Sequence, residues 1–322
     1  MSFLAPLPFR GGAGGGGVQP VPSMAPTPTP PLKGRGSSLC MVLALLAACA
    51  PSPQTVNPPP ANPPAGMQYL YGSGEAAALS VQAFAMLASH ATATAKARPV
   101  QSVVLASGAS LDQPRFVPCG DKPLAAVFDV DETVLLNIGY EYHDARSGKG
   151  FDEAAWDAWE RTGAGAVSPV PGAVAALAQL RAAGVTVVFN TNRSAANAAA
   201  TAQAIRTAGL GEAAHGQTLF LKGDDAMGSG KDARRATIAG RYCVIAMGGD
   251  QLGDFSDLFN ADQPVAARRA ATEATSIAAL WGRGWFVLPN PVYGSGLKGG
   301  FDDVFPMDKR WSATAGGRDN GQ

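Results

Sequence analysis

Two carboxylates one residue apart, Asp129 and Asp131, follow an apolar run, and a third, Glu132, comes directly after them. The run LAAVF at 124–128 has the composition of a buried strand. Like charges repel one another, and burial disfavours their ionised forms, so this crowding needs compensation. A divalent cation held by oxygen ligands would supply it. We therefore treat FDVDETVLLNIGY, residues 128–140, as a candidate catalytic centre.

Polar residues also follow three further apolar runs, VTVVF at 185–189, TLFL at 218–221 and YCVIAM at 242–247. Each cluster alone has an ordinary structural explanation, because hydroxyls often cap helices and single lysines are usually solvated. In a parallel sheet, however, ligands bind beyond the carboxyl ends of the strands, where these clusters would meet. Their members are Asn190, Thr191, Asn192 and Arg193 after the first run, Lys222 and Lys231 after the second, and Asp250 and Asp254 after the third.

The apolar runs are expected to form the sheet that brings these residues together. They are continuous rather than alternating, and a fifth lies at 285–288, which indicates a parallel sheet covered by helices on both faces. The Ala-rich segment from 67 to about 106 also reads as helical. We therefore predict an α/β fold, a doubly wound parallel sheet with a small helical accessory part. Helix candidates within it lie near 152–161, 172–183, 194–208, 231–239 and 266–281.

A site that combines acids, a hydroxyl and a cation is typical of enzymes that transfer a phosphoryl group by way of a phosphorylated aspartate. Asp129 would attack phosphorus and also bind the metal, and Asp250 would be a second metal ligand. Asp131 would protonate the leaving alkoxide and then deprotonate the attacking water. Thr191 would bind a phosphate oxygen, and Lys231 would balance the negative charge that develops.

Two other phosphate-binding interpretations fail on the sequence. A GxxxxGK[ST] loop ending at Lys231 would need Gly at 225 and Ser or Thr at 232, and both positions are Asp. The stretch GSGEAA at 72–77 follows no strand, so it predicts a helix start capped by Ser73 or Gly74.

The motifs resemble those of the class C, nonspecific acid phosphatases, which belong to subfamily IIIB of the haloacid dehalogenase superfamily and include lipoprotein 5′-nucleotidases. FDVDETVLLNIGY is similar to the family's first signature, including Thr133, Leu135, Asn137 and Tyr140. FNTNR, the SGKDAR run, GDQLGDF and FVLPNPVYGS also follow in the family's order. The resemblance covers roughly 67–300 and implies a haloacid-dehalogenase-type domain.

The resemblance also implies a set of site residues. Mg²⁺ would be bound by the side chains of Asp129 and Asp250 and by the backbone carbonyl of Asp131, with Asp254 supporting it through water. The SxKxxR match favours Lys231 over Lys222 as the catalytic lysine. Glu132 would have no catalytic duty and would be a structural or helix-start residue.

Two positions depart from the family pattern. Gln251 replaces an Asn next to the metal ligand, and Ala246 replaces a larger apolar residue. All carboxylates of the family pattern are present, so we expect activity. The metal affinity is expected to differ from that of other family members, if anything changes.

Family members act on nucleoside 5′-monophosphates, nicotinamide mononucleotide and aryl phosphates. The resemblance implies that aromatic residues sandwich the base or aryl group, with Tyr140, Trp156 and Tyr293 as candidates. Trp156 and Trp159 are three apart on one helix, and one of them is expected in the core. We expect Asn192 and Arg193 to contact substrate as well.

The first 66 of the 322 residues differ in composition from the rest, which has the apolar content of a globular domain. We interpret residues 1–48 as a signal region. Residues 1–23 are expected to be an over-long start, with Met24 or Met41 as the initiator. Leu46-Ala47-Ala48-Cys49 resembles a bacterial lipobox, with an ordinary signal peptide as the alternative. We expect Cys49 to carry lipid, with a Pro-rich linker to 66, a helical lead segment at 67–115, the phosphatase domain at 116–322 and a tail from about 303.

The remaining expectations concern surroundings and partners. The protein would be anchored by lipid in a bacterial cell envelope, at the outer membrane, with small phosphomonoesters as substrates. A net charge of +0 gives no reason to expect nucleic acid, and a homodimer is left open. Cys119 and Cys243 could form a disulfide or remain buried thiols. A phosphotransferase of the same fold, or a catalytically weak haem-binding lipoprotein, remains the alternative function.

Overall fold

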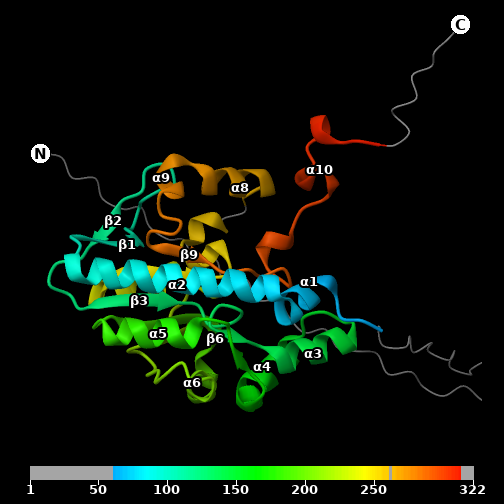
Figure 1. The fold of residues 1–322 in the computed structure, drawn as a ribbon, viewed down its shortest axis with the longest axis horizontal. Helices are drawn as coiled ribbons and strands as arrows, with labels where there is room; N and C mark the ends of the chain where they lie inside the picture. The colour runs from blue at the N-terminus through cyan, green and yellow to red at the C-terminus, as the bar shows by residue number, and fades with distance from the viewer. Residues whose placement is uncertain (1–60, 261–262, 313–322) are drawn as a thin grey trace, which may run out of the picture. The chain divides into compact units, whose positions relative to one another are not determined.

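A computed structural model describes residues 61–260 and 263–312 (Figure 1). The fold described below lies within Asn57–Gln322. The predicted signal region, the lipidated Cys49 and most of the Pro-rich linker lie outside the described residues.

Five parallel strands form the central sheet in the order β7-β6-β3-β8-β9. The central strand β3 places Val127 beside Val188 of β6 and Met247 of β8. Strands on either side of β3 come later in the chain, so the sheet is doubly wound, as predicted. The bounds are β3 Leu124–Phe128, β6 Thr186–Ser194, β7 Leu219–Lys222, β8 Cys243–Gly249 and β9 Trp285–Val287.

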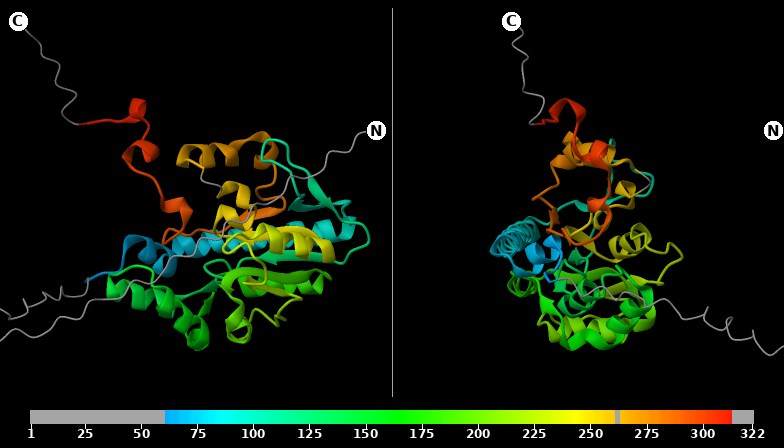
Figure 2. Two further views of the ribbon diagram at one scale, coloured as in Figure 1. Left: turned by 180° about the vertical axis from the view of Figure 1, so that it is seen from behind. Right: turned by 90° about the vertical axis from the view of Figure 1, so that its right-hand side faces the viewer.

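Helices cover both faces of this sheet, which explains why its strands are apolar throughout. On one face, Phe128 and Phe189 pack against α2 (Gly74–Ala97), α5 (Ala173–Ala182) and α6 (Ala198–Thr207). On the other, Val127 and Val188 pack against α7 (Asp232–Arg241) and α9 (Thr275–Ala278). Figure 2 shows the two layers from behind and from the side. The bounds of α8 are Val265–Glu273, and those of α10 are Phe301–Val304.

The lead segment is helical only in its first part. Helix α1 (Ala65–Met67) continues into a π-helical turn, Gln68–Gly72, and Ser73 then caps α2, with its hydroxyl accepting from the Ala76 backbone. The prediction of helix up to 106 is wrong at its end.

Strand β1 (Gln101–Leu105) occupies that end and pairs with β2 (Phe116–Pro118). It contains adjacent β-branched residues, Val103 and Val104, which favour extended structure. Arg98, in the left-handed region at φ 47°, ends the helix before it.

By length and composition, α2 is the one helix among the described residues that could cross a membrane. Its Phe84, Leu87 and Ala91 are buried in the core shared with α5 and the sheet. The side of α2 that carries these residues is therefore buried by the domain itself, whereas Leu79, Val81 and Met86 on the helix are exposed.

A small insertion follows β3 and forms the accessory part. Strand β4 (Leu135–Leu136) pairs with β5 (Ser168–Pro169), and between them lie α3 (Ile138–Ser147) and α4 (Glu153–Thr162). Figures 1 and 2 show α3 and α4 at the same end of the domain as α1. This insertion lies over the carboxyl ends of the strands, where the site residues were predicted.

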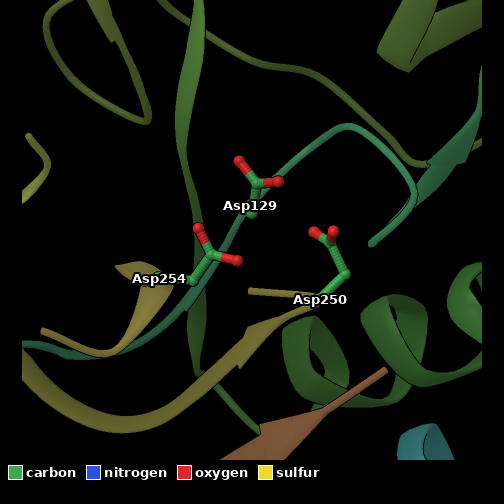
Figure 3. A group of neighbouring side chains, drawn as sticks. All are labelled: Asp129, Asp250 and Asp254. Carbon is green, nitrogen blue, oxygen red and sulfur yellow. The ribbon is translucent and has the colours of Figure 1, made fainter. Parts of the chain in front are cut away.

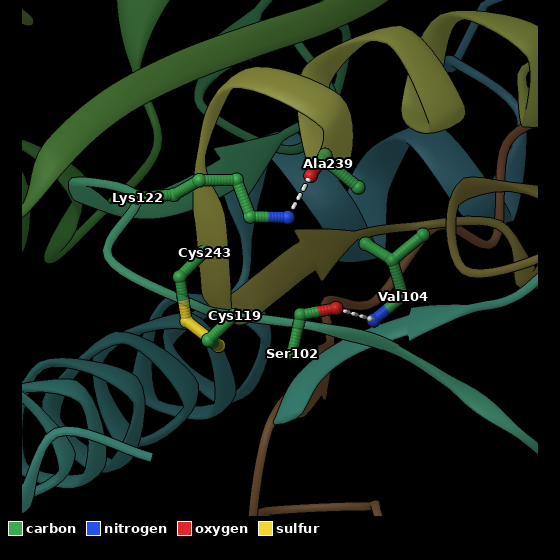
Figure 4. The surroundings of a disulfide bond; sticks show 6 residues. All are labelled: Ser102, Val104, Cys119, Lys122, Ala239 and Cys243. Carbon is green, nitrogen blue, oxygen red and sulfur yellow. Dashed lines mark hydrogen bonds between the residues drawn. A yellow bond between two sulfur atoms is a disulfide. The ribbon is translucent and has the colours of Figure 1, made fainter. Parts of the chain in front are cut away.

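A disulfide joins Cys119 to Cys243, with the two Cα atoms 4.6 Å apart (Figure 4). Both residues are buried, and Cys243 is the first residue of β8. The bond therefore joins the first residue of β8 to the segment before β3. It lies at the opposite end of β8 from Asp250. Of the two states that the sequence left open, the structure has the disulfide.

Replacing both cysteines with serine should lower the free energy of unfolding by about 2–5 kcal/mol, because the bond restricts the unfolded chain. Urea unfolding with and without a thiol reductant would measure this change. The wild-type protein should lose stability on reduction, and the double variant should not respond to the reductant. Equal stability of the two proteins under oxidising conditions would contradict the expectation.

Candidate active site

Three carboxylates converge beyond the carboxyl ends of the central strands (Figure 3). Asp129 directly follows β3, Asp250 follows β8, and Asp254 lies in the short helical turn Leu252–Asp254. One oxygen from each lies within 4.8 Å of the others. The sheet therefore brings Asp129 together with two acids that lie more than a hundred residues later in the chain, at the strand ends where the sequence analysis placed them.

Asp250 is oriented by three neutral donors. Its Oδ1 accepts a hydrogen bond from Thr133 Oγ1 at 2.9 Å, and its Oδ2 accepts from Gln251 Nε2 at 2.9 Å and Asn290 Nδ2 at 2.8 Å. Burial, with Asp254 beside it, raises the pKa of Asp250 above its ordinary value. These partners fix the carboxylate without neutralising it.

Lys231 is the cation at the centre of the cluster. Its Nζ donates to Asp129 Oδ1 and, at 2.7 Å, to Asp254 Oδ1, and the residue is 6% exposed. Burial alone would lower the pKa of Lys231, but the two carboxylates raise it above the usual value, so the ammonium is retained. Lys222 is exposed at the rim of the same cavity. The structure therefore places Lys231, the preferred candidate, beside Asp129.

A divalent metal fits this donor set. Burial raises the pKa of Asp129 well above its usual range, and Asp254 and Asp250 raise it further, although Lys231 opposes them. One lysine therefore does not compensate three converging carboxylates. The backbone carbonyl of Asp131, a predicted ligand, accepts no hydrogen bond within 61–260 or 263–312. Hard oxygen donors of this kind suit a divalent cation.

Asp131 is held on one side and open on the other. Its Oδ1 accepts hydrogen bonds from Asn137 Nδ2 and Arg193 Nε, both at 2.9 Å. Its Oδ2 has a longer contact, 3.4 Å, with Thr191 Oγ1. Asp131 lines the same cavity as Asp129, so its carboxyl can reach a group bound there.

Aromatic side chains line the outer part of this cavity. Tyr140 meets Trp156 edge to face with ring centroids 4.8 Å apart, and Tyr293 lies on another segment of the wall. Trp159 instead donates its Nε1 hydrogen to Asn137 Oδ1 at 2.9 Å. Of the two tryptophans, Trp156 lines the cavity and Trp159 supports Asn137.

The sequence model of the haloacid dehalogenase superfamily, subfamily IIIB (acid phosphatase), matches residues 76–296. The chain belongs to this family. Two solved structures of the class C acid phosphatase from Bacillus anthracis are similar in fold. The form with tungstate bound is 23% identical, with a TM-score of 0.59, and the alignment covers 78% of this chain and 91% of that one. The other is 25% identical, with a TM-score of 0.58 and coverages of 72% and 84%. The protein is therefore a phosphatase.

The phosphatase structure gives Arg193 several contacts within the protein. The residue is 1% exposed, and its guanidinium contacts Asp131, Asn137 Oδ1 at 2.8 Å and the ring of Trp156. These contacts turn Arg193 toward the Asp131 carboxylate, and its role toward substrate stays a prediction. It positions Asp131.

Asn192 and Thr191 are also engaged within the protein. Asn192 lines the cavity, but its amide donates to Ser229 O at 3.0 Å and accepts from Arg234 at 2.7 Å. Thr191 is fully buried, and its hydroxyl accepts from the Arg193 backbone at 3.1 Å. Both residues lie at the predicted strand end, and their roles toward substrate stay predictions.

Glu132 is a structural residue, but it is not at a helix start. It lies in a turn at φ 55° and is 1% exposed. Its carboxylate accepts from the Tyr71 hydroxyl at 3.2 Å, the Tyr293 hydroxyl and the Asn137 backbone at 2.9 Å. Burial and Asp131 raise its pKa to about 8, which the hydrogen bonds partly oppose. Glu132 thus joins the lead segment to the catalytic loop.

Sequence reasoning assigned no role to Asn137, Asn290 or Tyr71. Asn137 and Asn290 stand inside motifs that were recognised, so their positions carried a signal. Tyr71 carried none, because it reaches Glu132 from a π-helical turn 61 residues earlier in the chain. Gln251 was noted only as a departure, and its amide contacts both Asp250 and the Tyr293 backbone carbonyl, at 3.3 Å.

A further acid, Glu141, lines the cavity from α3 and is 5% exposed. Burial, with Asp144 and Asp131, raises its pKa from 4.5 to about 7. The folded protein therefore binds this proton more tightly than the unfolded chain does. It follows that the stability Glu141 contributes falls as the pH rises from about 4.5 to about 7.

Glu141→Gln should remove this dependence, because an amide does not titrate. The melting temperature of the variant relative to the wild type should rise between pH 5 and pH 8, as measured by circular dichroism. Glu212→Gln, at a side chain 77% exposed, is the matched control and should show no such trend. A constant difference between Glu141→Gln and the wild type would contradict the raised pKa.

Proposed function

We propose that the protein is a Mg²⁺-dependent phosphomonoesterase that works through an aspartyl-phosphate on nucleoside monophosphates and aryl phosphates. The observation that carries this proposal is the arrangement of Asp129. It stands among Asp250, Asp254 and Lys231, while Asp131, two residues away, is held by Arg193 and Asn137. A nucleophile within a charge-compensating cluster and a separately held acid are what phosphoryl transfer requires.

The side chains of Asp129 and Asp250, with the Asp131 carbonyl, would hold Mg²⁺, and Asp254 would lie beside them. When bound, Mg²⁺ would offset the charge of the carboxylates and the phosphate dianion. Lys231 contributes a second positive charge at the same place. The buried position of these groups strengthens their interaction with the anionic substrate, because the local dielectric is lower than in water.

In the first step, a carboxylate oxygen of Asp129 attacks phosphorus, and the bond from phosphorus to the alcohol oxygen breaks. The Asp131 carboxyl gives its proton to that oxygen, so the product leaves as a neutral alcohol. In the second step, Asp131 takes a proton from water as the water oxygen attacks phosphorus. The acyl phosphate bond breaks, which releases inorganic phosphate and restores the Asp129 carboxylate.

Arg193 and Asn137 support this cycle by holding Asp131 through one oxygen. They occupy Oδ1, which leaves Oδ2 as the oxygen that exchanges the proton.

The aromatic wall supports the choice of substrates. Tyr140, Trp156 and Tyr293 line a cavity of about 1530 Å³ that also contains Asp129. Rings of this kind stack on nucleobases and aryl groups without requiring a single identity. Among the described residues, no histidine lines the cavity, and His90 packs instead against Phe286.

The full chain should release p-nitrophenol from p-nitrophenyl phosphate in the presence of Mg²⁺ and lose this activity in EDTA. Asp129→Asn should lower kcat by roughly 1,000-fold or more, because it removes the nucleophile. A nucleotide panel in the same assay would give the substrate range, and calorimetric Mg²⁺ binding should weaken in Asp250→Asn.

Asp121→Asn is the matched control, since this exposed residue precedes β3 at the other end of the strand. It should behave as the wild type. Activity retained by Asp129→Asn would remove the nucleophile assignment. Glu132→Gln should be milder than Asp129→Asn or Asp131→Asn, since Glu132 is not a reacting group.

We also propose that the protein is held in a bacterial cell envelope, at the outer membrane, by lipid on Cys49. The basic flank, the short apolar run and the lipobox-like end support this location. The disulfide between Cys119 and Cys243 also supports it, because such bonds persist in oxidising compartments.

A radioactive fatty acid should label the full chain in a bacterial host, and Cys49→Ser should abolish the label because the acceptor thiol is gone. Cys40→Ser is the matched control and should keep the label. Labelling of the Cys49→Ser protein would contradict the anchor.

A further inference from the structure

One wall of the cavity carries acids that the proposed chemistry does not use. Glu141 and Asp144 come from α3, and Glu153 comes from the first turn of α4. Glu141 and Asp144 are three residues apart, so they project from one face of the helix. All three line the cavity that contains Asp129, but none belongs to the carboxylate cluster around Lys231.

Glu141 stands out because it is buried without a partner. It is 5% exposed and lines the cavity, where its carboxylate oxygens keep some solvent contact, and no described hydrogen bond or ion pair involves them. Buried carboxylates are normally paired, because the lost hydration must be replaced. Glu160 shows the contrast on the neighbouring helix, where it accepts from Trp156 Nε1 at 2.7 Å and from the Ser194 backbone at 3.0 Å.

Of the two lysines that line the cavity in the described region, only Lys231 has a described ion pair, and the exposed Lys222 has none. Lys231 pairs with Asp129 and Asp254, Arg193 pairs with Asp131, and Arg161 pairs with Asp157. No described ion pair involves Glu141, Asp144 or Glu153. This wall therefore keeps an unbalanced negative charge that faces the bound substrate.

Aromatic rings stand beside these acids. Tyr140 precedes Glu141 in α3, and its ring contacts that of Trp156. The ring centroids of Trp156 and Phe151 lie 6.4 Å apart. Arg193 covers the ring of Trp156 at 5.8 Å, which leaves Tyr140 and Phe151 as the nearby rings without a described cation. Aromatic faces together with carboxylates form the usual environment of an organic ammonium ion.

We propose that this wall, defined by Glu141, Asp144, Tyr140 and Phe151, binds a positively charged group on the alcohol part of the substrate. Phosphomonoesters of alkylammonium alcohols are then a further substrate class beside nucleoside monophosphates and aryl phosphates. This inference rests on the proposed function, since it concerns the part of the substrate that leaves with the alcohol oxygen. The phosphate would lie toward Asp129 and Lys231, and the ammonium group would lie toward Glu141.

The test compares phosphocholine with 3,3-dimethylbutyl phosphate, which has the same shape but carries carbon in place of the charged nitrogen. The full chain with Mg²⁺ should hydrolyse phosphocholine with a kcat/KM roughly tenfold higher. In Glu141→Gln this ratio should fall by at least about threefold. Asp121→Asn, which removes one negative charge far from the cavity, should keep the wild-type ratio.

A wild-type ratio at or below one would overturn the inference, whatever the variants do. A high ratio that Glu141→Gln leaves unchanged would overturn the assignment of the charge contact to this wall. Hydrolysis of p-nitrophenyl phosphate by the same wild-type preparation tests the proposed function separately, because that ester carries no cation.

Binding supplies a second readout that does not need turnover. Calorimetric titration of Asp129→Asn with the two esters should give a lower Kd for phosphocholine than for its neutral isostere. Equal Kd values would count against the cation contact even if the enzyme proved inactive.

Discussion

The structure depends on the mutual repulsion of carboxylates that a parallel sheet forces together. Asp129 directly follows β3, whereas Asp250 and Asp254 lie in the segment after β8, and all three meet at one edge of the sheet. Lys231 offsets part of this charge, and the remainder makes the cluster a place for a divalent cation and a phosphate. The repulsion between the carboxylates, which makes the site energetically costly, would therefore also be the source of its affinity for a cation.

Neutral donors and one buried arginine keep these charges in order. Thr133 and Asn290 fix Asp250 without neutralising it, whereas Arg193 and Asn137 fix Asp131 through a single oxygen. These arrangements suit the roles proposed for the two residues. A metal ligand such as Asp250 should stay ionised, whereas an acid/base group such as Asp131 should keep one oxygen free. The insertion between β4 and β5 supplies the walls around them. The carboxylate cluster and much of the cavity wall thus lie on different elements.

Much of the architecture could be predicted because the strands are buried on both faces. Continuous apolar runs separated by Ala-rich segments indicated β3, β6, β7, β8 and β9, and the strand ends indicated the acids. The β1–β2 hairpin was missed because β1 continues an Ala-rich helical segment and its pairing partner is not local. The exposed α3 was missed because only a few of its residues face the core.

The sequence by itself determined the family and the fold class and supplied the candidate reacting groups, since these depend on residue types at fixed spacings along single strands and loops. Only the tertiary structure decided which groups touch. It joined Cys119 to Cys243, turned Arg193 toward Asp131, and brought Tyr71 to Glu132. It also left Glu141 buried and unpaired among the described residues at the cavity wall. Such contacts depend on the packing of segments distant in sequence, which local residue patterns do not encode.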